Sequence, residues 1–320
     1  MNSPSVLITG ASGFVGEAIV FRLLVDKKFN PIAAVRGFTR LHGLCPIEPF
    51  NLADASALPS LKSVDVVIHA AARVHVMNET AVDALAEYRR FNVEGTLRLA
   101  RFAAESGVKR FIFISSVKVN GESTAVGRPF KPDDPAHPID AYGVSKYEAE
   151  EALKTLSQET GMDIVIIRPP LVYGPGVKAN FLTMLKWLNK GIPLPLGAIG
   201  NQRSLVAIGN LVDLIVTCID HPHAANQTFL VSDGEDLSTT QLLRRLASAL
   251  GKKPCLLPLP AQLLKFAASI LNKRPIAERI CGSLQVDISK NRTLLGWTPP
   301  INLDKAMRQT AGYFLEKNTK

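Results

Sequence analysis

The fold of this chain is decided by Val6-Leu7-Ile8-Thr9-Gly10-Ala11-Ser12-Gly13-Phe14-Val15-Gly16. An apolar run, typical of a strand, leads into three glycines spaced Gly-x-x-Gly-x-x-Gly and then into a helical pattern. Glycines at such a strand-to-helix turn let the backbone approach a pyrophosphate held at the helix N-terminus. The spacing differs by one residue from the usual dinucleotide fingerprint, so a simple tight turn is the alternative. The position at the start of a series of alternating strands and helices favours dinucleotide binding.

The rest of the first half alternates short apolar runs with longer helical patterns, which is typical of βαβ units and a parallel sheet. The apolar runs are rich in β-branched residues, and we expect the sheet to be buried on both faces. The predicted strands are 6–9, 32–35, 65–69, 110–115 and 163–167, and the predicted helices are 13–25, 82–105 and 142–159. The chain is therefore expected to adopt an α/β fold with a doubly wound parallel sheet.

A second, smaller lobe is predicted beyond Arg168-Pro169-Pro170, where glycine and proline interrupt the pattern. The run 205–208, a helix at 210–219 and the run 228–231 indicate a return to the sheet. Three further helices, at 239–250, 261–271 and 303–314, complete the lobe. We therefore expect a dinucleotide-binding domain of residues 1–172 and 205–232, and a substrate lobe of residues 173–204 and 233–320.

The composition excludes some classes of function. With 320 residues, 47% of them hydrophobic, the chain can bury a large core. The net charge is +9 and the pI is about 9.4, but the basic residues are scattered, which argues against nucleic-acid binding. A phosphate-bearing cofactor and substrate, with some attraction to an anionic membrane surface, explain the charge better.

The cysteines and the hydropathy of the sequence indicate the cellular compartment in which the protein is expected. The four cysteines are far apart and form no Cys-x-x-Cys pair, so we expect neither a metal site nor a disulfide framework, and a reduced, cytoplasmic compartment fits best. No basic segment followed by a long apolar stretch begins the chain, so no signal peptide is expected. The stretch 255–271 is apolar but is interrupted by Pro258, Pro260, Gln262 and Lys265. It predicts a packed or surface-docked helix and no integral membrane segment.

The end of the second predicted strand bears on the choice of cofactor. A free ribose 2′-hydroxyl usually meets an acidic residue there, whereas a 2′-phosphate needs a cation. This chain has Arg36, with Arg40 close behind and no acidic residue between Pro31 and Leu44. The pattern favours NADP(H), with NAD(H) as the second possibility, unless Arg36 is an ordinary surface arginine.

Tyr142 and Lys146 form the pair with the clearest chemistry. Residues four apart project to the same side of a helix, so the ammonium can stabilise the phenolate. A free tyrosine has a pKa near 10, and proton transfer at neutral pH needs roughly three units of depression. Ser116 follows another predicted strand at the edge where ligands bind in an open α/β sheet. Together, these three residues predict acid–base chemistry at a carbonyl or carbinol.

With these residues the chain resembles the extended short-chain dehydrogenase/reductase family, in its nucleotide-sugar 4-epimerase, dehydratase and reductase branch. Its motifs occur in the expected order along nearly the whole chain: the Gly10 loop, Asn51-Leu52, His69-Ala70-Ala71-Ala72, Asn92, Ser116, Tyr142 with Lys146, and the run from Arg168 to Gly176. The resemblance implies a Rossmann fold with a smaller, mostly C-terminal substrate lobe. It also implies a homodimer formed through the helices that begin near residues 82 and 142.

The resemblance assigns roles to individual residues. Ser116 would orient the substrate oxygen, Tyr142 would be the acid and base, and Lys146 would be its partner. The implied cofactor-binding residues are Gly10, Ser12, Gly13, Phe14, Val15, Gly16, Arg36, Arg40, Asn51, Leu52, Ala70, Ala71, Ala72, Asn92, Tyr142, Lys146 and Pro169. The implied contacts to a UDP-sugar are Lys118, Asn180, Arg203 and Arg279. The alternatives are that Asn92 only links a helix to a strand and that Arg203 is a surface charge.

Departures from the family pattern narrow the reaction. Val117 and Lys118 stand where the dehydratase branch carries an Asp-Glu pair, which argues against dehydration. Asn120 stands where many epimerases have tyrosine, and Arg36 stands where many have an acidic residue. The leading hypothesis is therefore an NAD(P)H-dependent 4-reductase.

Resemblance to a subgroup from bacterial O-antigen clusters suggests the substrate of such a reductase. It would be a UDP-4-keto-6-deoxy-N-acetylhexosamine, reduced to UDP-N-acetylquinovosamine for O-antigen and lipopolysaccharide synthesis. The first alternative is a UDP-N-acetylhexosamine 4-epimerase of the UDP-glucose type with retained NAD. The second is a non-catalytic dinucleotide-binding module on the same fold.

Overall fold

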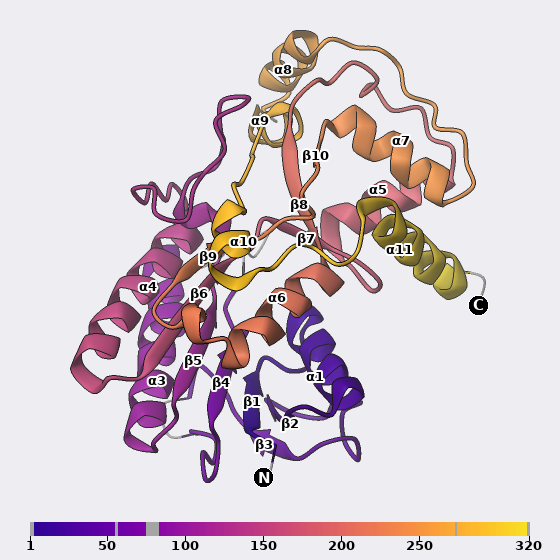
Figure 1. Cartoon of the computed structure of the whole chain (residues 1–320). Helices are drawn as coiled ribbons and strands as arrows, with labels where there is room; N and C mark the ends of the chain where they lie inside the picture. The colour runs from indigo at the N-terminus through magenta and orange to yellow at the C-terminus, as the bar shows by residue number, and fades with distance from the viewer. Residues whose placement is uncertain (1–2, 55–56, 75–82, 273, 319–320) are drawn as a thin grey trace.

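The computed structural model describes residues 3–54, 57–74, 83–272 and 274–318. In this part of the chain, seven parallel strands form the main sheet, in the order β3-β2-β1-β4-β5-β6-β9 (Figure 1). The strands are β1 (Ser5–Thr9), β2 (Asn30–Val35), β3 (Ile47–Pro49), β4 (Val66–His69), β5 (Arg110–Ile114), β6 (Asp163–Arg168) and β9 (Thr228–Leu230). The order reverses between β1 and β4, which is where ligands bind in such sheets.

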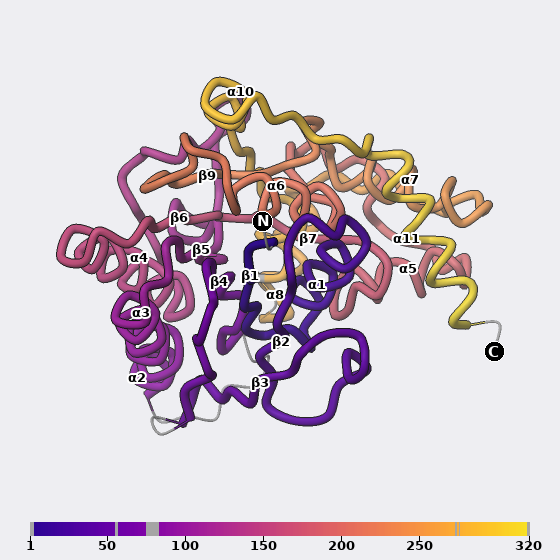
Figure 2. The backbone as a smooth tube through the Cα atoms, turned by 60° about the horizontal axis from the view of Figure 1, so that its bottom comes forward, coloured from indigo at the N-terminus to yellow at the C-terminus, as the bar shows by residue number. Residues whose placement is uncertain are grey.

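Helices cover both faces of this sheet, as Figures 1 and 2 show. On one face, α1 (Phe14–Asp26) and α6 (Ile208–Asp220) contribute buried residues such as Ile19, Leu23 and Ile215. On the other, α3 (Thr96–Glu105) and α4 (Ala141–Thr160) contribute residues such as Leu99 and Leu153. Strands that are covered on both faces are continuous apolar runs in the sequence, and the strands were predicted from these runs. The predicted doubly wound Rossmann fold is confirmed.

Two details of the main sheet and its helices differ from the prediction. The edge strand β3 was not predicted, because it is short and only partly buried. The helix predicted at 82–105 is instead α2 (Ala84–Arg89), a π-helical turn η1 (Arg90–Gly95) and α3, and its predicted start lies outside the described residues. Gly95 lies so close to Leu52 that a Cβ on it would be 2.8 Å from the Leu52 carbonyl oxygen. The π-helical turn therefore lies where this helical segment packs closely against the loop that contains Leu52.

A smaller sheet, ordered β10-β8-β7, forms the base of the second lobe. Its strands are β7 (Leu171–Tyr173), β8 (Arg203–Ala207) and β10 (Asp236–Leu237). The boundaries predicted at 172/173 and 204/205 each fall within one of these strands. The run 205–208 was predicted to return to the main sheet, which is wrong, because it lies in β8 and pairs with β7 and β10. A separate apolar core, with Tyr173, Phe181, Leu246 and Phe314, fills this lobe.

The other helices beyond β7 differ in where they pack. They are α5 (Ala179–Asn189), α7 (Thr239–Ala249), α8 (Ala261–Ile270), α9 (Arg274–Cys281), α10 (Ser289–Leu295) and α11 (Leu303–Asn318). Of these, α10 lies against β9 of the main sheet. Short 3₁₀ turns occupy η2 (Val117–Val119) and η3 (Pro222–Ala224). Among the described residues, none of these helices has the length and apolar character needed to cross a membrane.

Candidate active site

The glycine loop forms a tight cradle between β1 and α1. Gly10 has a φ of +65°, and a Cβ on it would lie 2.8 Å from the Ala71 nitrogen. A Cβ on Gly16 would lie 2.3 Å from the Gly10 carbonyl oxygen. Gly13 precedes α1 without a side-chain cap, so the first backbone N–H groups of the helix are available to an anion. The structure thus brings the loop from Gly10 to Gly16 against the end of β4, as a pyrophosphate site requires.

Substitution of Gly16 tests this cradle. Gly16→Ala is expected to lower dinucleotide affinity at least about tenfold, or ~1.4 kcal/mol, because the new methyl group must displace the loop backbone. Isothermal titration calorimetry with NAD and NADPH measures the change. Gly312→Ala in α11, where a Cβ meets no atom within 4 Å, is the matched control. Equal affinities of the two variants would contradict a role of the loop in binding.

Arg36 and Arg40 differ in their surroundings at the end of β2. Arg36 is exposed and makes no hydrogen bond or ion pair with another described residue. Arg40 is held by the Glu17 carboxylate of α1 and lies over the Phe21 ring, 5.4 Å from its centroid. Arg36 is therefore the guanidinium that is available to a ligand at this point.

Asn51 and Leu52 follow β3 and lie next to the end of β2. The Phe50 N–H donates to the Val35 carbonyl at 2.9 Å, which fixes this segment beside the end of β2. The Asn51 carboxamide accepts from the Ala53 N–H at 3.2 Å, and Leu52 is buried. Their predicted place at the adenine end of a cofactor is thus adjacent to Arg36.

Ser116 lies just beyond the end of β5. The N–H of Val117 donates to the Pro169 carbonyl at 3.0 Å, so the loop after β5 is joined to the loop after β6. The Ser116 hydroxyl oxygen accepts from the Lys118 N–H at 3.3 Å and begins η2. The structure therefore brings Ser116 close to Pro169, which the sequence placed in the cofactor site.

Tyr142 lies in the first turn of α4, directly against η2. The Asp140 carboxylate caps this helix by accepting from the Gly143 N–H at 2.7 Å. A Cβ on Gly143 would lie 3.0 Å from the Lys118 carbonyl oxygen, so the glycine allows a close approach. The Lys118 ammonium also pairs with Asp140. The segments that carry Ser116 and Tyr142 are thus fixed to each other.

Lys146 is buried one helical turn beyond Tyr142. Its ammonium donates to the Ile114 carbonyl at 2.8 Å and lies 4.2 Å from the centroid of the Phe113 ring. Burial lowers the pKa of Lys146 to about 7, although the charge of Glu150 opposes the shift. Lys146 is therefore anchored at the end of the strand that leads to Ser116.

The electrostatics of Tyr142 differ from the expected depression. Burial raises the pKa of Tyr142 above its ordinary value, and the charges of Asp140 and Tyr88 add to the effect. Lys146, one helical turn away, donates to the Ile114 carbonyl. The expected depression of the Tyr142 pKa is therefore not found, and its direction is the opposite.

A buried hydrogen-bond cluster supports the loop after β4. The His69 ring lies between the hydroxyls of Thr9, at 2.7 Å, and Thr96, at 3.0 Å. Burial, reinforced by the charge of Lys146, lowers the pKa of His69 to about 3, so the ring is neutral. The cluster therefore joins β1, β4 and α3 by uncharged groups.

Asn92, in the π-helical turn, connects this region to α4. Its carboxamide accepts from the Arg73 N–H at 2.8 Å, and donates to the Arg73 carbonyl at 3.1 Å and the Ser145 hydroxyl at 3.0 Å. These bonds correspond to the linking role that the sequence left open, and a contact of Asn92 with a cofactor stays a prediction.

The order and geometry of these elements agree with a comparison of the chain with known families. Residues 6–232 match the NAD dependent epimerase/dehydratase family. The chain belongs to this family. It is an enzyme of the nucleotide-sugar epimerase/dehydratase type, and the predicted family is confirmed.

Individual relatives of this epimerase/dehydratase family member are similar over its whole length. A Vibrio cholerae protein named UDP-glucose 4-epimerase is 50% identical over 319 residues, which covers 99% of this chain and 97% of the relative. The Thermotoga maritima UDP-glucose 4-epimerase, solved with UDP-glucose, has a TM-score of 0.77 at 23% identity, covering 98% of this chain and 99% of that one. The Bacillus cereus UDP-glucuronic acid 4-epimerase, solved with NAD, has a TM-score of 0.79 at 21% identity with the same coverage. The two solved structures share the fold.

A buried ion pair that the sequence did not predict lies next to the predicted catalytic residues of this epimerase/dehydratase family member. The Arg168 guanidinium donates to both oxygens of Glu150, at 2.5 and 3.0 Å, and to the Asn120 carboxamide oxygen at 3.0 Å. The Ser115 hydroxyl also donates to Glu150. A glutamate four residues after Lys146, on a face shared with buried residues, was the available signal. The pair connects α4, β5 and β6 directly behind Ser116 and Lys146.

The predicted substrate residues lie in two places. Arg203 in β8 donates to the Arg279 carbonyl at 2.8 Å and the Gly282 carbonyl at 3.2 Å. Burial, reinforced by the charge of Arg279, lowers the pKa of Arg203. The structure thus brings these two arginines together, and an anionic ligand would relieve their repulsion.

The other two predicted substrate residues are less closely grouped. Lys118 pairs with Glu122 at 2.9 Å as well as with Asp140, so its observed contacts are structural. Asn180 is exposed at the second position of α5. Substrate contacts of both residues stay predictions.

Proposed function

We propose that this protein is a 4-epimerase of a UDP-hexose or UDP-N-acetylhexosamine that retains NAD. The observation that carries the proposal is the geometry that fixes Tyr142 against the loop of Ser116, with Lys146 anchored at the end of the same strand. The name of the Vibrio cholerae relative supports this reaction over the 4-reductase that the sequence analysis favoured. The first alternative of the sequence analysis is therefore the better supported one.

The residues of the chain would divide the reaction as follows. The glycine loop, in which a Cβ would collide with the backbone, fits the pyrophosphate of a dinucleotide. A bound dinucleotide supplies a nicotinamide that exchanges hydride with C4 of the sugar. Tyr142 would move the proton of the 4-oxygen, Ser116 would orient that oxygen, and Lys146 would set the charge beside the phenol. Arg203 and Arg279 would hold the diphosphate and position the sugar.

Inversion at C4 without added cofactor tests this function. The purified protein is incubated with UDP-glucose or UDP-N-acetylglucosamine, and the C4 epimer is followed by ¹H NMR. We expect the epimer to form and NAD to copurify with the protein. The absence of inversion with both sugars, with NAD supplied, would contradict the proposal.

A second candidate is the NAD(P)H-dependent 4-reductase of a UDP-4-keto-6-deoxy-N-acetylhexosamine, which would give UDP-N-acetylquinovosamine for O-antigen and lipopolysaccharide synthesis. The unpaired Arg36 at the end of β2 favours it, because a guanidinium there suits the 2′-phosphate of an exchangeable NADPH. Cofactor oxidation that depends on the keto-sugar would identify this reaction.

The cofactor preference is tested at Arg36. Arg36→Gln is expected to lower NADPH affinity about tenfold or more and to leave NADH affinity within about twofold, because only NADPH carries the phosphate. Fluorescence titration with both cofactors measures the two constants. Arg128→Gln, at an exposed arginine on another loop, is the control. Equal losses of affinity for NADPH and NADH would show that Arg36 does not distinguish a 2′-phosphate from a 2′-hydroxyl.

Two structural predictions also remain proposals. We propose the division into a cofactor domain and a substrate lobe, with β7 and β8, which boundaries near residues 172 and 205 would divide, kept whole in the smaller sheet of the lobe. We also propose a homodimer through the helices that begin near residues 82 and 142, and sedimentation velocity tests it.

A further inference from the structure

Helix α8 turns its apolar side to solvent. Leu263, Phe266, Ala267, Ile270 and Leu271 recur at positions i, i+3, i+4, i+7 and i+8, which is the stripe that a helix normally buries. Here all five are exposed, and the exposed fractions of Phe266 and Ile270 are 66% and 68%. No residue of α8 is fully buried. The stripe is therefore available to something outside the chain.

The exposed surface extends beyond α8 itself. Leu257, in the segment before α8, is 51% exposed, and Ile276 in α9 is 56% exposed. Figure 1 places α8 and α9 at the outer end of the substrate lobe, away from α3 and α4. We call Leu257, the α8 stripe and Ile276 the α8 patch. These exposed apolar residues lie on neighbouring segments at the outer end of the lobe, and exposed apolar surface of this kind marks interaction sites.

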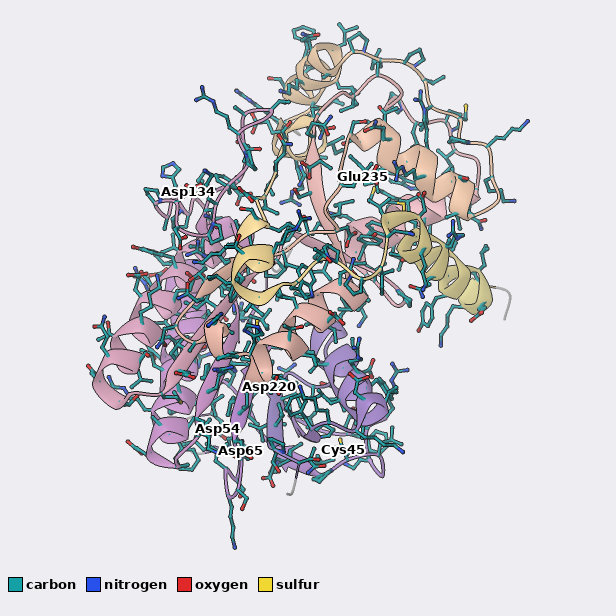
Figure 3. All side chains as sticks on the ribbon, in the orientation of Figure 1. Cys45, Asp54, Asp65, Asp134, Asp220 and Glu235 are labelled. Carbon is teal, nitrogen blue, oxygen red and sulfur yellow. The ribbon has the colours of Figure 1, made fainter. Side chains whose placement is uncertain are left out.

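The surroundings of the α8 patch are basic. Between residues 252 and 281 the sequence has six lysines and arginines and one acidic residue, Glu278. Lys265 of α8 is exposed, as are Arg274 and Arg279 of α9, and Glu278 is paired with Arg274 at 2.8 Å. The acidic side chains labelled in Figure 3 lie away from α8. This segment thus supplies an apolar surface with an excess of positive charge.

We propose that the α8 patch docks this enzyme on the surface of an anionic lipid bilayer. An amphipathic helix with lysines beside its apolar stripe lies in the interface plane, with the stripe in the headgroup and acyl boundary and the lysines near the lipid phosphates. A second copy of the chain fits less well. A two-fold pairing of the patch would bring the same lysines of both copies together.

Docking through α8 has a consequence for the substrate lobe. The α9 helix that follows carries Arg279, whose carbonyl binds Arg203. One of the two arginines proposed to hold the diphosphate therefore lies on the helix that directly follows α8. The docking itself does not depend on which sugar the enzyme takes.

Vesicle flotation of the full chain tests the proposal. We expect the wild type to bind vesicles of about 70% phosphatidylcholine and 30% phosphatidylglycerol at least about tenfold more strongly than pure phosphatidylcholine vesicles. Phe266→Ser combined with Ile270→Ser is expected to reduce that binding about tenfold or more. Val25→Ser, at a residue of α1 that is 76% exposed, is the control and should bind like the wild type.

Stability, activity and oligomeric state distinguish membrane docking from misfolding and from self-association. Both variants should keep the thermal midpoint within about 2 °C and the activity on a soluble UDP-sugar, because the changed side chains are exposed. Failure of the wild type to bind anionic vesicles, or equal binding by the double variant, would overturn the proposal. A dimer in sedimentation equilibrium that the double variant dissociates, without vesicle binding by the wild type, would assign the α8 patch to self-association instead.

Discussion

Tyr142→Phe is expected to lower kcat by about 10³-fold with little change in cofactor affinity. The phenol is the group that we propose moves the proton of the sugar 4-oxygen, and it lies in the first turn of α4, packed against η2. The ring packs edge-on against Tyr88 at a centroid distance of 6.0 Å, and phenylalanine preserves that contact. The loss is therefore expected in the chemical step rather than in folding.

Initial rates with the C4 assay, together with NAD affinity, measure the effect. Tyr147→Phe, on the same helix, is the matched control and should retain the wild-type kcat. A Tyr142→Phe variant that kept more than about a tenth of the wild-type kcat would assign the proton transfer to another group. Loss of activity in both variants would instead indicate damage to α4.

Arg168→Met is expected to lower the free energy of unfolding by about 3–5 kcal/mol. The side chains of Arg168 and Glu150 are 4% and 0% exposed, so removal of the guanidinium leaves a buried carboxylate without its partner. The Asn120 oxygen and the Pro132 carbonyl also lose a donor. A buried, uncompensated charge is among the most destabilising changes that a single substitution makes.

Urea denaturation followed by circular dichroism measures this loss. Lys154→Met is the control. It breaks the exposed Lys154–Glu151 pair on α4, the helix that carries Glu150, and should lower the free energy of unfolding by at most about 0.5 kcal/mol. Arg168→Met combined with Glu150→Leu should recover part of the stability, because the unpaired charge is then absent. A cost below about 1 kcal/mol for Arg168→Met alone would show that water reaches Glu150.

The strands and the glycine loop could be predicted from the sequence because their signals are local. Parallel strands buried on both faces are continuous apolar runs, and Gly10 and Gly16 stand where a Cβ would collide with the backbone. The β3 strand and the π-helical turn could not be predicted in this way. Their form depends on contacts with distant segments, such as the close approach of Gly95 to Leu52.

The candidate site likewise has a part that could be predicted from local sequence and a part that could not. Ser116, Tyr142 and Lys146 were found from their spacing and their place after strands. The nearby ion pair of Glu150 and Arg168 was not predicted, because the two residues are 18 residues apart and meet only when α4 packs on β6. The hydrogen bond from Lys146 to the Ile114 carbonyl likewise needs the folded chain, as does the burial that raises the pKa of Tyr142. The presence of Arg36 alone was not sufficient evidence to distinguish a reductase from an epimerase.

The π-helical turn from Arg90 to Gly95 makes this segment sensitive to length as well as to residue type. Successive residues of an α-helix are rotated by about 100°, so deletion of one residue here would rotate everything before it relative to α3. Asn92 could then no longer reach both Arg73 and Ser145. Single-residue insertions and deletions should therefore be tolerated on the exposed loops and rejected in this turn.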